Sequence, residues 1–190
     1  MDTDKLTTEE QQILLKLARQ SLEAGVKGEK LPTLHINEMP SRLQADGTSF
    51  VTLTIKGELR GCIGALEAYQ SLAEDVQQHA ISAALDDFRF PPVRPEELDK
   101  INIEISRLTT PTPLDYNSPD DLLAKLRPGI DGVVLKDQNR RATFLPQVWE
   151  KIPDPEEFLD SLCYKMGVPQ KLWRTKPLTA LVYQVEEFHE

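Results

Sequence analysis

The stretch SFVTLTIKGELRGCIG, residues 49–64, decides the fold because it contains a predicted β-hairpin. Its first half alternates apolar and polar side chains, which is typical of a strand with one buried face; Val51, Leu53 and Ile55 share the apolar face. The next residues, Lys56-Gly57-Glu58, predict a tight turn, because glycine adopts positive φ without steric cost. The segment LRGCIG therefore returns as a second strand, antiparallel to the first.

Alternation also sorts the side chains of LRGCIG onto two faces of the predicted strand. The apolar face holds Leu59, Gly61 and Ile63, and the other face holds Arg60, Cys62 and Gly64. Side chains two residues apart on a strand are about 6.6 Å apart, so Arg60 is expected to stand beside Cys62 and to favour its thiolate form. The two glycines weaken a strand, which indicates that another backbone or a ligand comes close.

Cys62 has two interpretations, and the residue pattern leaves both open. A free cysteine usually behaves as a small buried hydrophobe, and Arg60 could then pair with Glu104, on the polar face of a later predicted strand. Alternatively, Cys62 is a nucleophile or a redox thiol that Arg60 assists. Cys163, by contrast, belongs to an apolar stripe at helical spacing, so we predict that it lies in the core and does not pair with Cys62.

The rest of the chain mixes helices with strands. Two capping-box patterns, at Thr7 and at Ser71, predict helices that end near Gly25 and Leu85. Further predicted elements are a strand over 101–108, a helix over 155–166 and a closing strand over 178–188. Because the strands are mainly hairpin-linked and no βαβ rhythm occurs, the expected class is α+β with mainly antiparallel sheets.

Composition limits the kinds of partner. The 190 residues include 22 Lys and Arg against 31 Asp and Glu, a net charge of −9. A chain this acidic is repelled by phosphate backbones and anionic lipids, so we expect neither a nucleic-acid partner nor a membrane partner. The two cysteines are far apart in sequence, which favours a reduced, cytoplasmic protein.

Motifs for metals and cofactors are missing from the sequence. The three histidines, His35, His79 and His189, are scattered without ligand spacing, so no metal site is predicted. Neither the glycine-rich phosphate loop nor the dinucleotide-binding glycine pattern occurs, so no cofactor is expected.

Several motifs together resemble one known family. LRGCIG is followed in order by DFRFPPV, IEISRL, PGIDGVVL and ATFLPQVWE. This set resembles the AMMECR domain family, also called AmmeMemoRadiSam system protein A, over nearly the whole chain. One departure is Phe88, where the family usually has proline.

The resemblance implies two unequal α+β subdomains with a cleft between them, and the motif strand facing that cleft. The larger subdomain would hold both termini. From the Pro-rich break after residue 108 we place a single domain over 1–190, with the larger subdomain at 1–111 plus 177–190 and the smaller at 112–176.

The resemblance also implies an association with Memo-type and radical-SAM proteins. The sequence therefore predicts an accessory or binding component that holds a ligand, a peptide or a protein partner in its cleft. The expected contact residues are Leu59, Arg60, Gly61, Cys62, Ile63, Gly64, Arg89, Phe90 and Glu104. The alternative is an enzyme in which Cys62 is the catalytic nucleophile or redox thiol and Arg60 assists it.

Overall fold

The structure is a computed structural model that describes residues 5–190. The chain forms two compact units, one running to Leu108 and including Glu186–Glu190, the other spanning Thr109–Val185. Each unit contains helices and one antiparallel sheet, so the fold is α+β as the sequence predicts.

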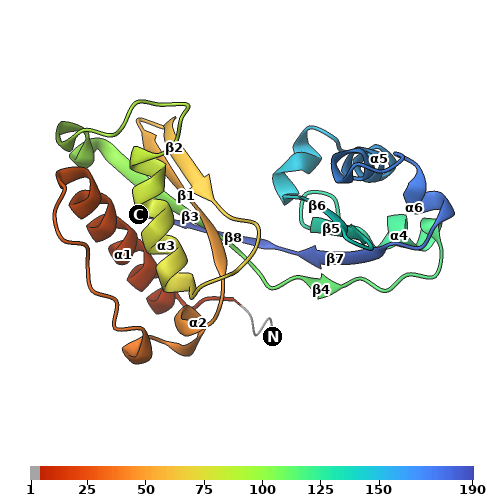
Figure 1. Cartoon of the computed structure of the whole chain (residues 1–190), viewed down its shortest axis with the longest axis horizontal. Coiled ribbons are helices and arrows are strands. Elements are labelled where there is room, and N and C mark those ends of the chain that lie inside the picture. Colours follow the sequence, from red (N-terminus) through yellow and green to blue (C-terminus); the bar gives the residue numbers. More distant parts are fainter. Residues whose placement is uncertain (1–4) are drawn as a thin grey trace. The chain divides into compact units, whose positions relative to one another are not determined.

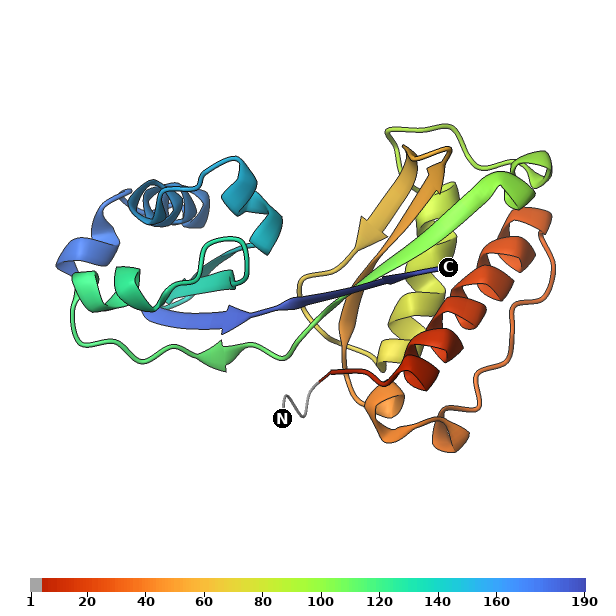
Figure 2. The ribbon, with the colours of Figure 1, turned by 180° about the vertical axis from the view of Figure 1, so that it is seen from behind.

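The first unit is a four-stranded sheet covered by helices on one face. The strand order is β2-β1-β3-β8, with β1 at Thr48–Ile55, β2 at Glu58–Gly64, β3 at Ile101–Leu108 and β8 at Val185–His189. Two helices, α1 (Thr8–Lys27) and α3 (Leu72–Leu85), lie side by side on the sheet (Figure 1). The view from behind shows the same arrangement (Figure 2), so the apolar core of this unit lies between the helices and one sheet face.

Both predicted capping boxes are confirmed, but α1 ends later than expected. Thr7 accepts a hydrogen bond from the Glu10 N–H, and Ser71 accepts one from Glu74. The helix continues to Gly28, whose positive φ of 68° ends it, rather than to Gly25. Gly25 lies inside α1. A Cβ there would be only 3.1 Å from Ile81 of α3, so the glycine permits close packing of the two helices.

The predicted hairpin of residues 49–64 is confirmed. Lys56 and Gly57 both have positive φ, 55° and 82°, which is the geometry of a two-residue turn whose twist matches that of the strands. The pairing then changes register: Leu53 pairs with Gly61 and Thr54 pairs with Leu59, so Arg60 has no cross-strand partner. Such an extra residue is a β-bulge, and it alters which side chains share a face.

Short elements connect the main ones. In the first unit these are α2 (Ser41–Gln44) and the 3₁₀ helices η1 (Ile36–Glu38) and η2 (Pro95–Lys100). The second unit has the 3₁₀ helix η3 (Pro146–Glu150).

The second unit has its own sheet and its own core. The strand order is β4-β7-β5-β6, with β4 at Thr112–Pro113, β5 at Gly132–Asp137, β6 at Arg140–Phe144 and β7 at Thr179–Tyr183. Its helices are α4 (Pro119–Lys125), α5 (Pro155–Met166) and α6 (Leu172–Thr175). Phe158 of α5 stacks on Trp149 with ring centroids 3.6 Å apart. Cys163 is fully buried in this core and both cysteines are free, which confirms the prediction for Cys163.

The closing segment differs from its prediction as one strand. It is divided into β7 and β8, which belong to different sheets, with Gln184 between them. The chain passes from the first compact unit to the second after Leu108 and returns to the first after Val185, whereas the expected boundaries lie after residues 111 and 176. Alternation shows that a segment is extended, but the sheet that it joins depends on distant partner strands.

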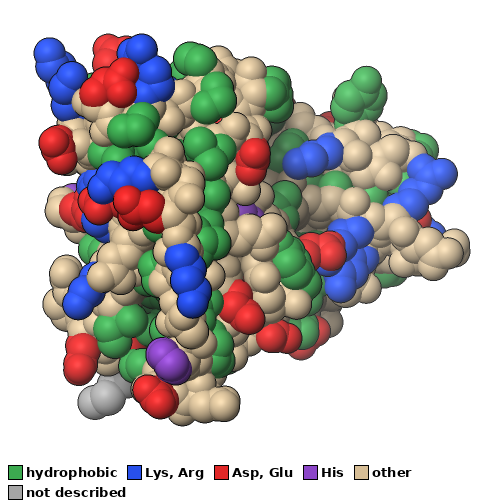
Figure 3. Space-filling view, turned by 60° about the vertical axis from the view of Figure 1, so that its left-hand side comes forward, with side chains coloured by type: hydrophobic (Ala, Val, Ile, Leu, Met, Phe, Trp, Pro, Cys, Tyr) green, Lys and Arg blue, Asp and Glu red, His purple; other side chains and the backbone are tan. Residues whose placement is uncertain are grey.

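The character of the helices and the charges on the surface both bear on possible partners. Within residues 5–190, no helix combines the length and the apolar character that a membrane span requires. On the face drawn in Figure 3, basic and acidic side chains are interspersed.

Candidate functional site

LRGCIG lies on β2, an edge strand of the first sheet, as predicted for a strand. The bulge at Arg60 makes the expected sorting of faces wrong at one position. Leu59 lies opposite Thr54 and is 43% exposed, so it does not share the core face with Ile63. Ile63 lies opposite Val51 and packs against the core, as expected. Simple alternation fails here because a bulge adds one residue to one strand only.

Arg60 is bound to the segment that follows α3. Its Nε and Nη2 donate to the two carboxylate oxygens of Glu97 at 2.9 and 3.1 Å, and its Nη1 donates to the Pro91 carbonyl at 3.0 Å. This hydrogen-bonded ion pair lowers the pKa of Glu97 to about 2. Arg60 therefore pairs with Glu97 and not with Glu104, and its guanidinium ties the 91–97 segment to β2.

The backbone of Cys62 is held by two side chains. Asp87 Oδ2 accepts the Cys62 N–H at 2.8 Å, and Arg89 Nη2 donates to the Cys62 carbonyl at 3.2 Å. Arg89 also donates to both oxygens of Asp87, at 2.9 and 2.7 Å. These hydrogen bonds from Arg89, with those from backbone N–H groups, hold the pKa of Asp87 well below its usual range. The pair thus takes the place that a neighbouring strand would occupy, which protects the sheet edge from pairing with another chain.

The side chain of Cys62 belongs to a row that crosses three strands. Thr52 lies directly between Cys62 on β2 and Glu104 on β3. The Thr52 hydroxyl is 3.2 Å from Cys62 Sγ, and all three side chains are half-buried. We call these three residues the sheet row. It lies on the face opposite α1 and α3, because the neighbouring Val51 and Leu53 point into the core.

The close neighbours of the two motif glycines belong to this chain. A Cβ on Gly61 would lie 2.0 Å from the Ala83 carbonyl oxygen of α3, so glycine permits β2 to approach the helix backbone. A Cβ on Gly64 would lie 2.4 Å from the ring of Phe50, which pairs with Gly64 across the hairpin. Internal packing therefore accounts for both glycines, without a ligand.

The remaining predicted residues lie in the turn after α3. The Arg89 guanidinium carbon is 5.6 Å from the centroid of the Phe90 ring. The site residues expected from the sequence did not include Asp87, Thr52 or Glu97. The Asp-x-Arg spacing at 87–89 was a usable signal for the pair of Asp87 and Arg89 that holds the Cys62 backbone, which we call the clamp. The roles of Thr52 and Glu97 depend on tertiary contacts.

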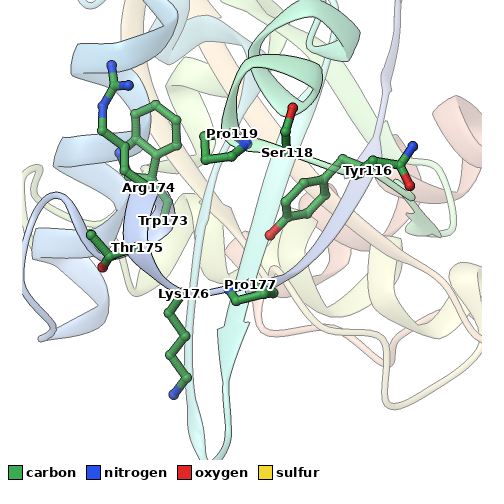
Figure 4. Close-up of a pocket in the computed structure, with 9 residues that line it drawn as sticks. Tyr116, Ser118, Pro119, Trp173, Arg174, Thr175, Lys176 and Pro177 are labelled. Carbon is green, nitrogen blue, oxygen red and sulfur yellow. The ribbon is translucent and has the colours of Figure 1, made fainter.

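The second unit contains a pocket that none of the predicted site residues lines. Its volume is about 210 Å³, and its walls include Tyr116, Pro119, Trp173 and Pro177 (Figure 4). The Tyr116 hydroxyl bonds the backbone of Leu178 as both donor and acceptor. The two basic residues of the lining are each paired with a carboxylate, Arg174 with Glu156 and Lys176 with Asp137. The charges at this pocket are therefore largely satisfied.

Metal-binding side chains are not grouped in the part of the chain that the structure describes. Residues 5–190 hold no cluster of three or more His, Cys, Asp or Glu side chains arranged to bind a metal ion.

The fold and the site together define a two-unit α+β protein in which an edge strand carries a clamped Cys62. The family model AMMECR1 matches residues 15–188, and the chain belongs to this family. The chain is 40% identical to a protein of Methanothermobacter thermautotrophicus, over 97% of this chain and 96% of that relative. It is 37% identical to protein MK0488 of Methanopyrus kandleri, over 98% and 91% of the two chains.

A solved structure is also similar. The crystal structure of the uncharacterized protein PH0010 from Pyrococcus horikoshii matches with a TM-score of 0.75 and 32% identity, over 97% of this chain and 93% of that chain.

Proposed function

We propose that this protein is an accessory component that binds a partner through the sheet row of Cys62, Thr52 and Glu104. The observation that carries the proposal is Glu104. It is a half-buried carboxylate, and no salt bridge joins it to another residue in the described range 5–190. A partly desolvated carboxylate is stabilised by a cationic group or an N–H donor, which a partner would supply.

The groups around the sheet row support binding rather than chemistry. The Cys62 backbone is committed to Asp87 and Arg89, and Arg60 is committed to Glu97. The thiol, the Thr52 hydroxyl and the Glu104 carboxylate are therefore the groups left to meet a peptide or protein. The partners we propose are a Memo-type protein and a radical-SAM protein, within the AmmeMemoRadiSam system of the cytoplasm and without nucleic acid or membrane.

The test measures binding of the purified full chain to each of these two proteins by biolayer interferometry. Glu104→Lys should weaken the Kd by about tenfold or more, because it places a like charge against the partner's cation. The matched control, Glu29→Lys, makes the same charge change at an exposed position after α1 and should bind as wild type. Equal binding by wild type and Glu104→Lys would contradict the proposal.

A second candidate function is an enzyme that uses the Cys62 thiol as nucleophile or redox group. The contact that favours it is the Thr52 hydroxyl, 3.2 Å from Cys62 Sγ. Rapid alkylation of Cys62 by iodoacetamide below pH 7 would support this candidate, because the thiolate is the reacting form. Inertness under the same conditions would leave the binding function.

A further inference from the structure

Phe88 is the most exposed large apolar side chain in the described range, with 96% of its surface accessible. Single exposed apolar residues are common and need no explanation by themselves. What distinguishes Phe88 is that its neighbours are fixed. Asp87, directly before it, is only 4% exposed.

The backbone on both sides of Phe88 is held by hydrogen bonds. Asp87 Oδ1 accepts the Arg89 N–H at 3.1 Å, and the Asp87 carbonyl accepts the Phe90 N–H at 3.0 Å. The Val93 N–H donates to the Ala84 carbonyl at 2.8 Å, which closes the turn onto α3. The exposed ring is thus carried on a preorganised turn, so that binding through it has a low cost in backbone entropy.

Arg89 gives this surface its charge. Its side chain is 46% exposed, and its Nε and Nη2 bond Asp87 and the Cys62 carbonyl. Within residues 5–190, no hydrogen bond involves its Nη1, which therefore keeps donors for a partner. Asp87 is buried, so the charged side chains exposed around Phe88 are those of Arg89, which follows it directly, and of Asp86, two residues before it.

We propose that Phe88 is an anchor that inserts into an apolar pocket of a partner protein, and that a carboxylate at the rim of that pocket accepts hydrogen bonds from Arg89. Aromatic and arginine side chains together dominate the binding energy of many protein interfaces. This inference rests on the proposed function, because it names the chemistry of the partner that the same unit binds.

Two other occupants fit less well. A second copy of this chain would offer the pocket of the second unit, whose lining residues in the described range include no Asp or Glu to accept hydrogen bonds from Arg89. An anionic membrane would repel a chain of net charge −9.

The experiment compares Phe88→Ala with wild type in binding to the purified Memo-type and radical-SAM proteins. Phe88→Ala should weaken the Kd by about tenfold or more, and Phe88→Trp should restore binding to within about threefold. The control, Tyr164→Ala, truncates another aromatic side chain, 72% exposed on α5, and should bind as wild type. The midpoint of thermal unfolding should not change in Phe88→Ala, because an exposed ring makes few native contacts.

Each remaining outcome overturns the anchor. If Glu104→Lys weakens binding and Phe88→Ala does not, the anchor is wrong and the proposed function stands. If neither protein binds wild type, both fail. Phe88-dependent dimers in sedimentation would replace the partner protein with a second copy. Phe88-dependent binding to phosphatidylcholine–phosphatidylserine vesicles would replace it with a membrane.

Discussion

Asp87 and Cys62, 25 residues apart in the chain, are joined by a 2.8 Å hydrogen bond from the Cys62 N–H to the Asp87 carboxylate. Arg89 completes the arrangement by bonding both the carboxylate and the Cys62 carbonyl. One cysteine on an edge strand thus has both of its backbone polar groups satisfied by side chains from a turn. This clamp fixes the position of the LRGCIG strand end and of the exposed turn together.

The clamp should contribute measurably to stability. Asp87→Asn removes the charge that bonds Arg89 and should lower the free energy of unfolding by about 2 kcal/mol, measured by urea denaturation at pH 7. The neighbouring Asp86→Asn changes the same charge at an exposed position and should stay within about 0.5 kcal/mol of wild type. Equal stability of the two variants would show that the clamp adds nothing to folding.

Stability should fall in acid, partly because of Glu97. Its pKa is lowered from 4.5 to about 2 by the hydrogen bond from Arg60, so the folded state favours the ionised form. The stabilisation is complete above the unfolded pKa and is lost as the pH falls through the folded value. Between pH 5 and pH 2, Glu97→Gln should remove about 2 kcal/mol of the pH-dependent loss measured by urea denaturation. Glu96→Gln, at an exposed carboxylate, should keep the wild-type slope.

Gly61 should tolerate no side chain. Gly61→Ala would place a Cβ 2.0 Å from the Ala83 carbonyl oxygen, and the backbone of α3 cannot move aside cheaply. We expect a loss of about 3 kcal/mol in the free energy of unfolding. Gly25→Ala is the matched control, because its Cβ would meet only the Ile81 side chain, at 3.1 Å, and alanine favours the helix. A change of similar size in both variants would refute the backbone contact as the cause.

The two thiols should differ in reactivity. Cys62 is half-buried, whereas Cys163 is fully buried and burial raises the pKa of its thiol. Iodoacetamide at pH 8 should therefore label one thiol per native chain and both after unfolding in guanidinium, as counted by intact mass. Cys62→Ser should show no labelling in the native state. Labelling of Cys163 in the native chain would mean that the second unit opens readily.

Local patterns predicted several elements in both units. The capping boxes at Thr7 and Ser71, the hairpin around Gly57 and the apolar stripe at Cys163 all depend on neighbours within a few residues, and each is present in the structure. The family was also evident from the motifs. The candidate site was predicted less completely. Cys62 and Glu104 were expected on one face, and they share it, but the pairing of Arg60 with Glu104, which one of the two interpretations allowed, does not occur.

The sequence by itself determined the α+β class, the position of the LRGCIG strand and the burial of Cys163, because periodicity and turn chemistry are local properties of the chain. Only the tertiary structure decided that Arg60 sits in a bulge and pairs with Glu97, and that Asp87 and Arg89 hold the Cys62 backbone. It also divided the closing segment between two sheets. The physical reason is that registers, bulges and ion pairs depend on which distant segments meet, and the spacing of residues along one segment carries no information about that choice.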